Sequence, residues 1–386
     1  MQIIVKTTTA CNFACEYCSE GDKKPLELSK QIFQKLIDEL PQLLEHKQDD
    51  CVNILWHGGE PLLWGREKLI ACMEYAERKL KKYHLEFIMQ SNGYLIDDTF
   101  MEMFQRFHVR VGISLDGYPE LHNKNRPLKD GTQTFDKVWN NIQRLRDNHL
   151  GGSILMVLNT ENVDGEKLFK FLEENEVVCK INPLIPCGKA SKREVKKISQ
   201  GYIALLQYLF EKAVESQKKI VIEPIDSIMD AIISGSTLSE CSYNGNCSQS
   251  ILCLYSDGKI GFCGRDSEKE KYVYGDLQKN SLMDLYNCEI AQKVRVRDSY
   301  LKAHNCRNCS VWDLCHGGCT FEALNHWGDM NMPFPYCEER RELLKYLQTH
   351  GLDLLKKRLI REKKEQRIRL EEKKRLLKEV TAYEGK

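Results

Sequence analysis

The sequence predicts an α/β protein. Residues 1–233 are expected to form a partial (β/α)₆ barrel of the TIM type, followed by a small cysteine-rich domain and a charged helical tail. Short apolar runs alternate with amphipathic helical patterns through the first part of the chain, which indicates parallel strands connected by outer helices. Near residue 235 the alternation stops, and cysteines take the place of apolar core residues. Six repeats are too few for a closed eight-fold barrel, so we expect an open one. A doubly wound sheet is the alternative, and periodicity does not separate the two.

Each expected strand is a short run rich in Val, Ile, Leu or Phe between turn-forming residues. The strands are expected at 2–8, 52–57, 85–91, 109–114, 153–159 and 177–183. Helical patterns begin after Ser29, an N-cap candidate, and recur over about 66–83, 97–107, 134–149, 164–174 and 200–217.

The rest of the chain divides into a loop-rich cysteine domain, 234–340, and a tail, 341–386. The tail combines many charged residues with sparse Leu and Ile, which predicts one or two exposed helices with a solvated charged face. A docking surface for a protein or peptide partner is the alternative interpretation.

The charge balance argues against nucleic acid or an anionic membrane as partner, because 57 basic residues face 56 acidic ones and the net charge is +1. The sequence has no run of 18 apolar residues, and its first residues lack the apolar stretch of a signal peptide. We therefore expect a soluble, cytoplasmic protein.

Cysteine is the unusual residue, with 17 in the chain. An odd count in a long chain argues against a secreted disulfide scaffold, and closely spaced thiols in a reducing compartment usually bind metal. Cys11, Cys15 and Cys18 follow the first expected strand, at the sheet edge where α/β active sites lie. Three thiolates can hold three irons of a [4Fe–4S] cube and leave the fourth iron open. A structural zinc site would need a fourth ligand, which is missing nearby in the sequence.

This CxxxCxxC pattern resembles the signature of the radical S-adenosylmethionine (SAM) enzymes. The resemblance implies that the open iron binds SAM, and that one electron cleaves SAM to methionine and a 5′-deoxyadenosyl radical. The run Gly58-Gly59-Glu60-Pro61 resembles the GGEP motif that holds the SAM amino group. Glycines allow a close backbone approach, and a carboxylate suits an ammonium group.

Further SAM contacts are implied by the same resemblance. Asn92 closes the third strand, Ser114 and Arg126 are expected at the ribose and carboxylate, and Tyr17 and Leu184 at the adenine. His122 lies in the same region, and we expect it to be structural rather than catalytic.

A second cysteine system is similar to the SPASM pattern, which follows radical SAM barrels and holds two auxiliary [4Fe–4S] clusters. Its core is Cys306-x₂-Cys309-x₅-Cys315-x₃-Cys319-x₁₇-Cys337, preceded by Gly258-x₄-Cys263. The resemblance implies one cluster on Cys241, Cys247, Cys263 and Cys319, and another on Cys306, Cys309, Cys315 and Cys337. The expected cofactors are therefore SAM and three [4Fe–4S] clusters. A zinc ribbon is the alternative, and Cys253 competes with Cys241 or Cys247 as a ligand.

Within this group the chain looks like ribosomal-peptide maturases and anaerobic sulfatase-maturing enzymes. Sulfatase maturases place an Asp base directly after the cysteine that corresponds to Cys263, where this chain has Gly264; Asp266 is the candidate base two residues further on. This departure favours peptide maturation, in which hydrogen abstraction from a ribosomally made peptide leads to a thioether or carbon–carbon crosslink. Formation of formylglycine from Cys or Ser is the alternative. An iron–sulfur electron carrier is disfavoured, because such carriers ligate every iron.

The expected partners are a peptide or protein substrate and a reductant such as flavodoxin or ferredoxin. Because the first strand begins at residue 2, no N-terminal leader-binding domain is expected. Leader recognition would then need the tail, the SPASM surface or a separate leader-binding protein.

Overall fold

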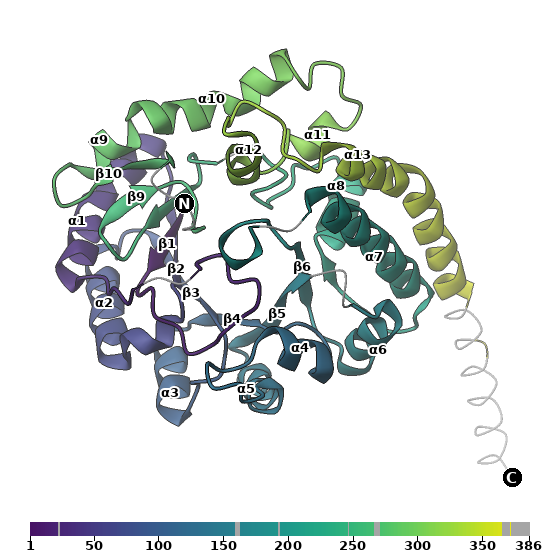
Figure 1. Cartoon of the computed structure of the whole chain (residues 1–386), viewed down its shortest axis with the longest axis horizontal. Coiled ribbons are helices and arrows are strands. Elements are labelled where there is room, and N and C mark those ends of the chain that lie inside the picture. Colours follow the sequence, from purple (N-terminus) through teal and green to yellow (C-terminus); the bar gives the residue numbers. More distant parts are fainter. Residues whose placement is uncertain are drawn as a thin grey trace, which may run out of the picture.

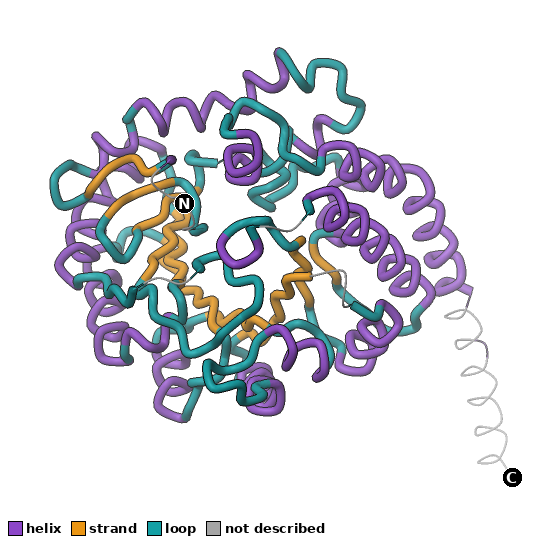
Figure 2. The backbone as a smooth tube through the Cα atoms, viewed as in Figure 1, coloured by secondary structure: helices purple, strands orange, loops and turns teal. Residues whose placement is uncertain are grey.

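The computed structural model describes residues 1–21, 24–158, 163–191, 194–245, 247–265, 271–364 and 371. In these residues the strands form one continuous sheet in the order β10-β9-β8-β1-β2-β3-β4-β5-β6-β7. The sheet curves around the centre of the molecule, with helices on its outer side (Figures 1 and 2). Within the same residues, the helices are all too short or too polar to cross a membrane.

The first half of the chain has the expected βα order, and its neighbouring strands are parallel. Every expected strand is present to within two residues at each described end, and Asn159 lies outside the described residues. A seventh short strand extends the sheet beyond the six expected. The strands are β1 (Gln2–Lys6), β2 (Cys51–His57), β3 (His84–Ser91), β4 (Arg110–Ser114), β5 (Gly151–Leu158), β6 (Cys179–Pro183) and β7 (Ile222–Glu223).

The helices between the strands cover the outer side of the sheet (Figure 1). In α1, the Ser29 hydroxyl caps the first turn by accepting a 3.2 Å hydrogen bond from the Gln31 backbone nitrogen, and the apolar residues at helical spacing are fully buried. The helices are α1 (Lys30–Lys47), α2 (Arg66–Lys79), α3 (Asp98–Arg106), α4 (Pro119–Asn125), α5 (Phe135–Asp147), α6 (Gly165–Asn175), α7 (Val195–Glu215) and α8 (Ile225–Ser234).

The cysteine-rich segment continues the barrel sheet. Its first strand, β8 (Ile251–Leu254), pairs in parallel with β1, and β9 (Lys259–Gly261) and β10 (Val273–Asp276) follow in antiparallel pairing. Main-chain hydrogen bonds therefore join the second expected domain to the first. Of the helices that follow, α9 (Leu282–Tyr286) packs against α1 and α13 (Cys337–Tyr346) against α7. The helices between them lie across the ring from β3–β5 in Figure 1: α10 (Glu289–Ala303), α11 (Trp312–Cys315) and α12 (Thr320–Trp327).

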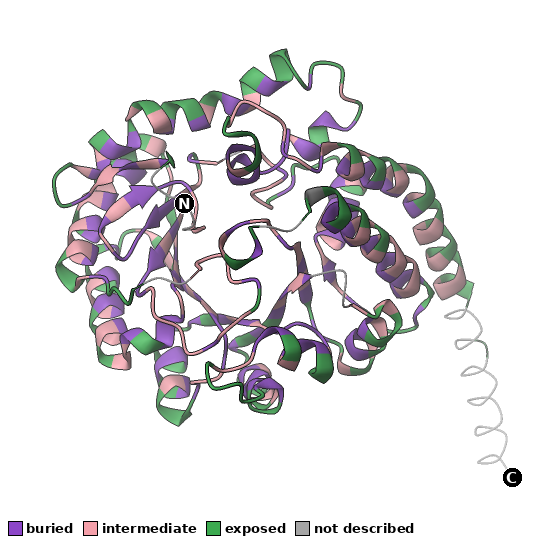
Figure 3. Ribbon diagram, viewed as in Figure 1, coloured by how far each residue is buried: buried purple, intermediate pink, exposed green. Residues whose placement is uncertain are grey.

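The described part of the tail packs against the barrel, whereas we expected freely exposed helices. Leu343, Leu344 and Leu347 are fully buried. Arg358 Nη1 donates a 2.9 Å hydrogen bond to the Ala213 carbonyl at the end of α7, and the outward side of this segment is largely exposed (Figure 3). The apolar residues that looked sparse in the sequence thus form one narrow contact face.

Candidate active site

The structure brings the first thiol group (Cys11, Cys15 and Cys18) together in the loop after β1. Burial raises the pKa of the Cys11 thiol to about 12, and the charges of Glu60, Cys15 and Cys18 add to this shift. Burial also raises the pKa of Cys15 to about 11, although Arg126 opposes it. Metal binding requires thiolates, so a cluster bound here would have to displace these protons and compensate the thiolate charges. Three thiols are the number that a cube with one open iron needs.

The GGEP turn lies directly on the segment that leads into this loop. The Gly59 nitrogen donates a 2.7 Å hydrogen bond to the Thr8 carbonyl, and the Glu60 nitrogen donates a 2.8 Å bond to the Ala10 carbonyl. A Cβ atom on Gly59 would overlap the Ala10 carbonyl, and one on Gly58 would lie 2.6 Å from the Thr8 oxygen. Both glycines are therefore needed for this close approach.

Glu60 is fully buried, and its carboxylate is bonded to protein groups. It accepts hydrogen bonds of 2.8 Å from Ser91 Oγ, 2.7 Å from the Asn92 nitrogen and 3.1 Å from the Leu62 nitrogen. Burial raises its pKa to about 7, although these bonds oppose the shift. These bonds tie the carboxylate to the loop after β3, and its contact with the SAM amino group stays a prediction. That loop places Asn92 Nδ2 2.8 Å from Asn12 Oδ1, beside Cys11.

Asp116 joins two of the expected SAM contacts. Its fully buried carboxylate accepts a hydrogen bond from the Tyr17 hydroxyl and forms a 3.0 Å ion pair with Arg126 Nε. The Val157 nitrogen also donates to it, at 3.2 Å, and the Arg126 guanidinium lies 5.4 Å from the centre of the Tyr17 ring. This role was not predicted from the sequence, because Asp116 precedes Gly117 in what resembles an ordinary turn.

The remaining expected contacts lie at the same edge of the sheet. Tyr17 and Leu184 belong to one small buried cluster, which brings the two expected adenine neighbours together. Ser114 ends β4, where its hydroxyl accepts a 3.0 Å hydrogen bond from Gln90 Nε2. His122 is structural, as predicted: its Nδ1 accepts a 3.1 Å bond from the Asp116 nitrogen, and burial lowers its pKa to about 4.

The charge interactions among the auxiliary cysteines fall within each of the two expected ligand sets, and the assignment of these cysteines to two clusters stays a prediction. In the second thiol group (Cys241, Cys247, Cys263 and Cys319), burial raises the pKa of Cys241 well above its usual value, and the charges of Cys247 and Cys319 add to this. In the third thiol group (Cys306, Cys309, Cys315 and Cys337), burial raises the pKa of Cys306 to about 11, and the other three thiols contribute. Cys253, the competing candidate, is fully buried on β8 in the apolar core.

Two charged residues near the second thiol group escaped the sequence analysis. Arg265 Nη1 lies 3.4 Å from Cys319 Sγ, and its guanidinium lies over the Phe321 ring. Glu322 is buried, its Oε2 has no hydrogen-bond partner in the described part of the chain, and burial raises its pKa. The sequence signal that could have identified Glu322 as buried is its position between two apolar residues, Phe321 and Leu324, both of which are buried. Asp266, the expected base, lies outside the described residues.

Helix α12 connects the auxiliary region with the loop after β6. Asn325 Nδ2, one turn beyond Glu322, donates a 3.1 Å hydrogen bond to the Pro186 carbonyl. Further along the same loop, the Lys189 nitrogen donates a 3.0 Å bond to the Cys18 carbonyl. Glu322 therefore lies on a helix that touches a loop in direct contact with the first thiol group.

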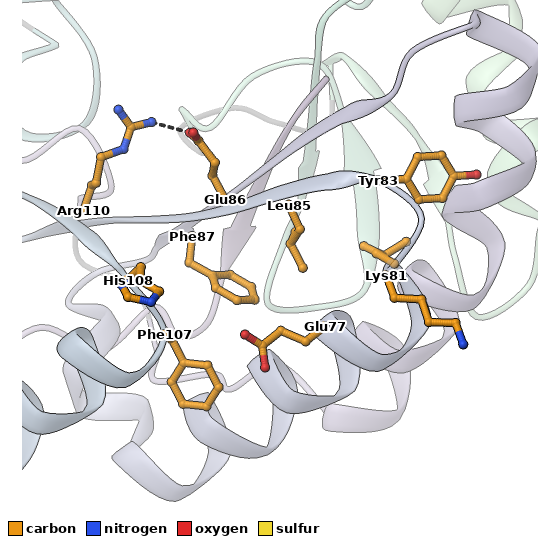
Figure 4. A pocket seen from close by; sticks show the side chains of 10 residues that line it. Glu77, Lys81, Tyr83, Leu85, Glu86, Phe87, Phe107, His108 and Arg110 are labelled. Atoms are coloured by element: carbon orange, nitrogen blue, oxygen red, sulfur yellow. Dashed lines mark hydrogen bonds and ion pairs between the residues drawn. The ribbon is translucent and has the colours of Figure 1, made fainter.

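A surface pocket of about 430 Å³ lies at the opposite end of the sheet (Figure 4). It is lined by the first residues of β3 and β4 and by Phe107, and Arg110 and Glu86 form an ion pair at its rim. Because the thiols gather at the carboxyl ends of the parallel strands, this pocket is separate from the chemistry.

An α/β ring with a three-thiol loop after its first strand and two four-thiol groups beside it defines an iron–sulfur enzyme. Residues 5–172 match the model of the Radical SAM superfamily, and residues 241–310 match that of the SPASM iron-sulfur cluster-binding domain. Together they cover more than half of the chain. The protein belongs to the radical SAM enzymes and carries a C-terminal SPASM domain, and its cofactors are SAM and [4Fe–4S] clusters.

The chain is similar to the cysteine-type anaerobic sulfatase-maturating enzyme of Clostridium perfringens strain 13, with 24% identity over 358 residues, 89% of this chain and 95% of that protein. The serine-type enzyme of Bacteroides thetaiotaomicron is 23% identical, over 93% of this chain and 92% of that one. Among solved structures, anSMEcpe with bound AdoMet and Cp18Cys peptide has a TM-score of 0.77 at 21% identity, covering 92% of this chain and 99% of that chain. Streptococcus suis SuiB bound to its precursor peptide SuiA has a TM-score of 0.58 at 15% identity, covering 87% and 75%.

Proposed function

We propose that this protein oxidises a Cys or Ser residue of a sulfatase to formylglycine. The observation that carries the proposal is the extent of the likeness to anaerobic sulfatase-maturating enzymes, which spans 89% of this chain and 95% of the C. perfringens protein. The fold comparison supports the same choice, since anSMEcpe is matched over 99% of its length and SuiB over 75%. Both comparisons favour formylglycine formation, the alternative in the sequence analysis, over crosslinking of a ribosomally made peptide.

The reaction on a Cys residue removes one hydrogen from Cβ and one from sulfur and forms a thioaldehyde. Water then replaces the sulfur, which leaves as H₂S, and the aldehyde remains. When bound, SAM and the clusters supply the 5′-deoxyadenosyl radical that takes the Cβ hydrogen and an acceptor for the remaining electron. The protein must supply a base for the thiol proton.

Two carboxylates are candidates for this base. Gly264, at the position of the Asp base of sulfatase maturases, has no side-chain acceptor, and a Cβ atom built there would lie 3.1 Å from the Ile4 side chain. Asp266 remains the sequence-based candidate. Glu322 is the second candidate, because its buried carboxylate lies on the helix that contacts the loop beside the first thiol group. General-base removal typically slows a reaction about 10²- to 10⁴-fold.

The test is anaerobic turnover of Cys- and Ser-containing sulfatase peptides with SAM and dithionite, followed by mass spectrometry with and without a hydrazine trap. The trap is needed because a Ser-derived aldehyde and a crosslink are both lighter by two hydrogens. We expect a trapped aldehyde from the wild type and its loss in Asp266→Ala or Glu322→Gln. A control with all three cysteines of the first thiol group changed to Ala should form no 5′-deoxyadenosine.

Crosslinking of a ribosomally made peptide is the second candidate function, favoured by Gly264 in place of the Asp base. A product that is lighter by two hydrogens and does not react with the trap would establish it and exclude formylglycine formation. Reduction by a flavodoxin or ferredoxin and use of a separate leader-binding protein remain predictions.

A further inference from the structure

Arg297 is a buried arginine that the reaction described above does not use. It lies on α10 and is 2% exposed. Its guanidinium donates hydrogen bonds of 3.0 Å to the Gly318 carbonyl and 3.1 Å to the Gly317 carbonyl, and Nη2 donates a 2.9 Å bond to the Met332 carbonyl. Nε also donates to the Met330 carbonyl. The guanidinium therefore holds two backbone segments together.

The first of these segments joins the two auxiliary thiol groups. It runs from Cys315, in the third group, to Cys319, in the second. His316, Gly317 and Gly318 between them have φ values of 49°, 71° and 74°, three consecutive residues in the left-handed region. Such a backbone is strained for His316 and persists only when its surroundings hold it, and the bonds from Arg297 to the two glycine carbonyls do so.

The charge of Arg297 acts on both auxiliary thiol groups. Its guanidinium interacts with Cys247 and Cys319 of the second group and with Cys306 and Cys315 of the third. Arginine stays protonated in proteins. Because reduction adds negative charge to a cluster, a nearby buried cation stabilises the reduced form and raises the reduction potential.

Arg265 provides a comparison, because the cysteines with the largest charge interactions with it belong to one group. Its Nη1 lies 3.4 Å from Cys319 Sγ, and its guanidinium also interacts with Cys263 and Cys241. All three cysteines belong to the second thiol group.

We propose that Arg297 is a positioning residue shared by the two auxiliary clusters: it fixes the loop that connects them, and its charge raises the reduction potential of both. Arg265 acts on one cluster only. This role is independent of the peptide substrate, so it goes beyond the proposed function and stands or falls separately from it.

The test is a potentiometric titration of the reconstituted full-length protein, followed by electron paramagnetic resonance. Arg297→Gln should lower the midpoint potentials of both auxiliary clusters and leave the SAM-binding cluster unchanged. Arg265→Gln should lower the midpoint potential of one auxiliary cluster only, the cluster held by the second thiol group. A Cys319→Ala variant identifies which potential belongs to that cluster. Lys293→Gln, which removes an exposed charge from the same helix, is the control and should change none.

Arg297→Lys separates charge from loop geometry, because lysine keeps the charge and loses the forked hydrogen bonds. We expect its two auxiliary potentials to stay close to those of the wild type. The proposal would be overturned if the midpoint potentials shifted equally in Arg297→Lys and Arg297→Gln, or if Arg297→Gln shifted the potential of only one auxiliary cluster. If Arg297→Gln loses auxiliary iron, Arg297→Lys decides: retained iron at wild-type potentials supports the charge role. Loss of iron in both variants contradicts the expected rescue by lysine and overturns the charge role, leaving only the contacts to the loop.

Discussion

The buried ion pair between Asp116 and Arg126 makes a quantitative prediction. The Asp116 side chain is fully buried and that of Arg126 is 8% exposed, with 3.0 Å between Oδ2 and Nε. Replacing one partner leaves the other charge buried without compensation, which typically costs about 3–5 kcal/mol. We therefore expect Asp116→Leu and Arg126→Met each to lower the free energy of unfolding by at least about 3 kcal/mol.

The double variant is the decisive measurement. With both charges gone, the apolar pair avoids the desolvation penalty, so the combined loss should be smaller than the sum of the two single losses by about 2 kcal/mol or more. Thermal unfolding of the anaerobically reconstituted proteins measures this, since 1 kcal/mol corresponds to about 2–4 °C in a domain of this size. Additive losses would refute the pairing of these two side chains.

Removing the charge of Asp116 should also affect function, because its carboxylate accepts a hydrogen bond from the Tyr17 hydroxyl as well. Asp116→Asn keeps the shape and one acceptor oxygen but removes the charge opposite Arg126. We expect weaker SAM binding and slower 5′-deoxyadenosine formation, with the iron content unchanged. SAM affinity equal to that of the wild type would show that the network only stabilises the fold.

Changing the three cysteines of the first thiol group to Ala should remove about four of about twelve irons per chain and abolish 5′-deoxyadenosine formation, as measured by iron and nucleoside analysis. Gly59→Ala should cost about 1–3 kcal/mol or more through overlap with the Ala10 carbonyl. Gly351→Ala is its control in thermal unfolding, because a Cβ there meets only ordinary van der Waals contacts at 3.4–3.5 Å. Burial raises the pKa of Asp226 from 3.8 to about 6, so the folded state binds its proton more tightly and stability falls as pH rises through this interval. Asp226→Asn should therefore be more stable than the wild type by about 3 kcal/mol at pH 7–8, and the difference should vanish below about pH 3.

The strands of the barrel and the position of the cluster loop were predictable, because both depend on local sequence. β1 to β6 are apolar runs bounded by turn residues, and Cys11, Cys15 and Cys18 are spaced within one loop. These three cysteines could be assigned to one cluster site without knowledge of tertiary contacts. The same holds for the glycines at 58 and 59, whose small size signals a close approach before its partner is known.

The contacts that position this site were not predictable, because their partners are distant in the chain. The Tyr17 hydroxyl and Asp116 are separated by 99 positions, and Asp116 has the local sequence of a turn. Arg297 lies in α10, where it is the one buried residue among six charged ones, and its neighbours in the sequence do not distinguish it from the exposed charges. A buried charge is recognised only when the groups around it are known, and periodicity does not supply them.

The continuity of the sheet was missed for a different reason, and it matters most for the function. β8 and β9 have only four and three residues, too short for a periodic pattern. Yet β8 pairs with β1, and the Ser256 hydroxyl beyond it donates a 2.8 Å hydrogen bond to the Lys6 carbonyl. Cys263 follows β9, whereas the first thiol group follows β1. The first thiol group and Cys263 of the second are thus carried by one hydrogen-bonded sheet, which fixes their separation by backbone pairing rather than by the packing of two independent domains.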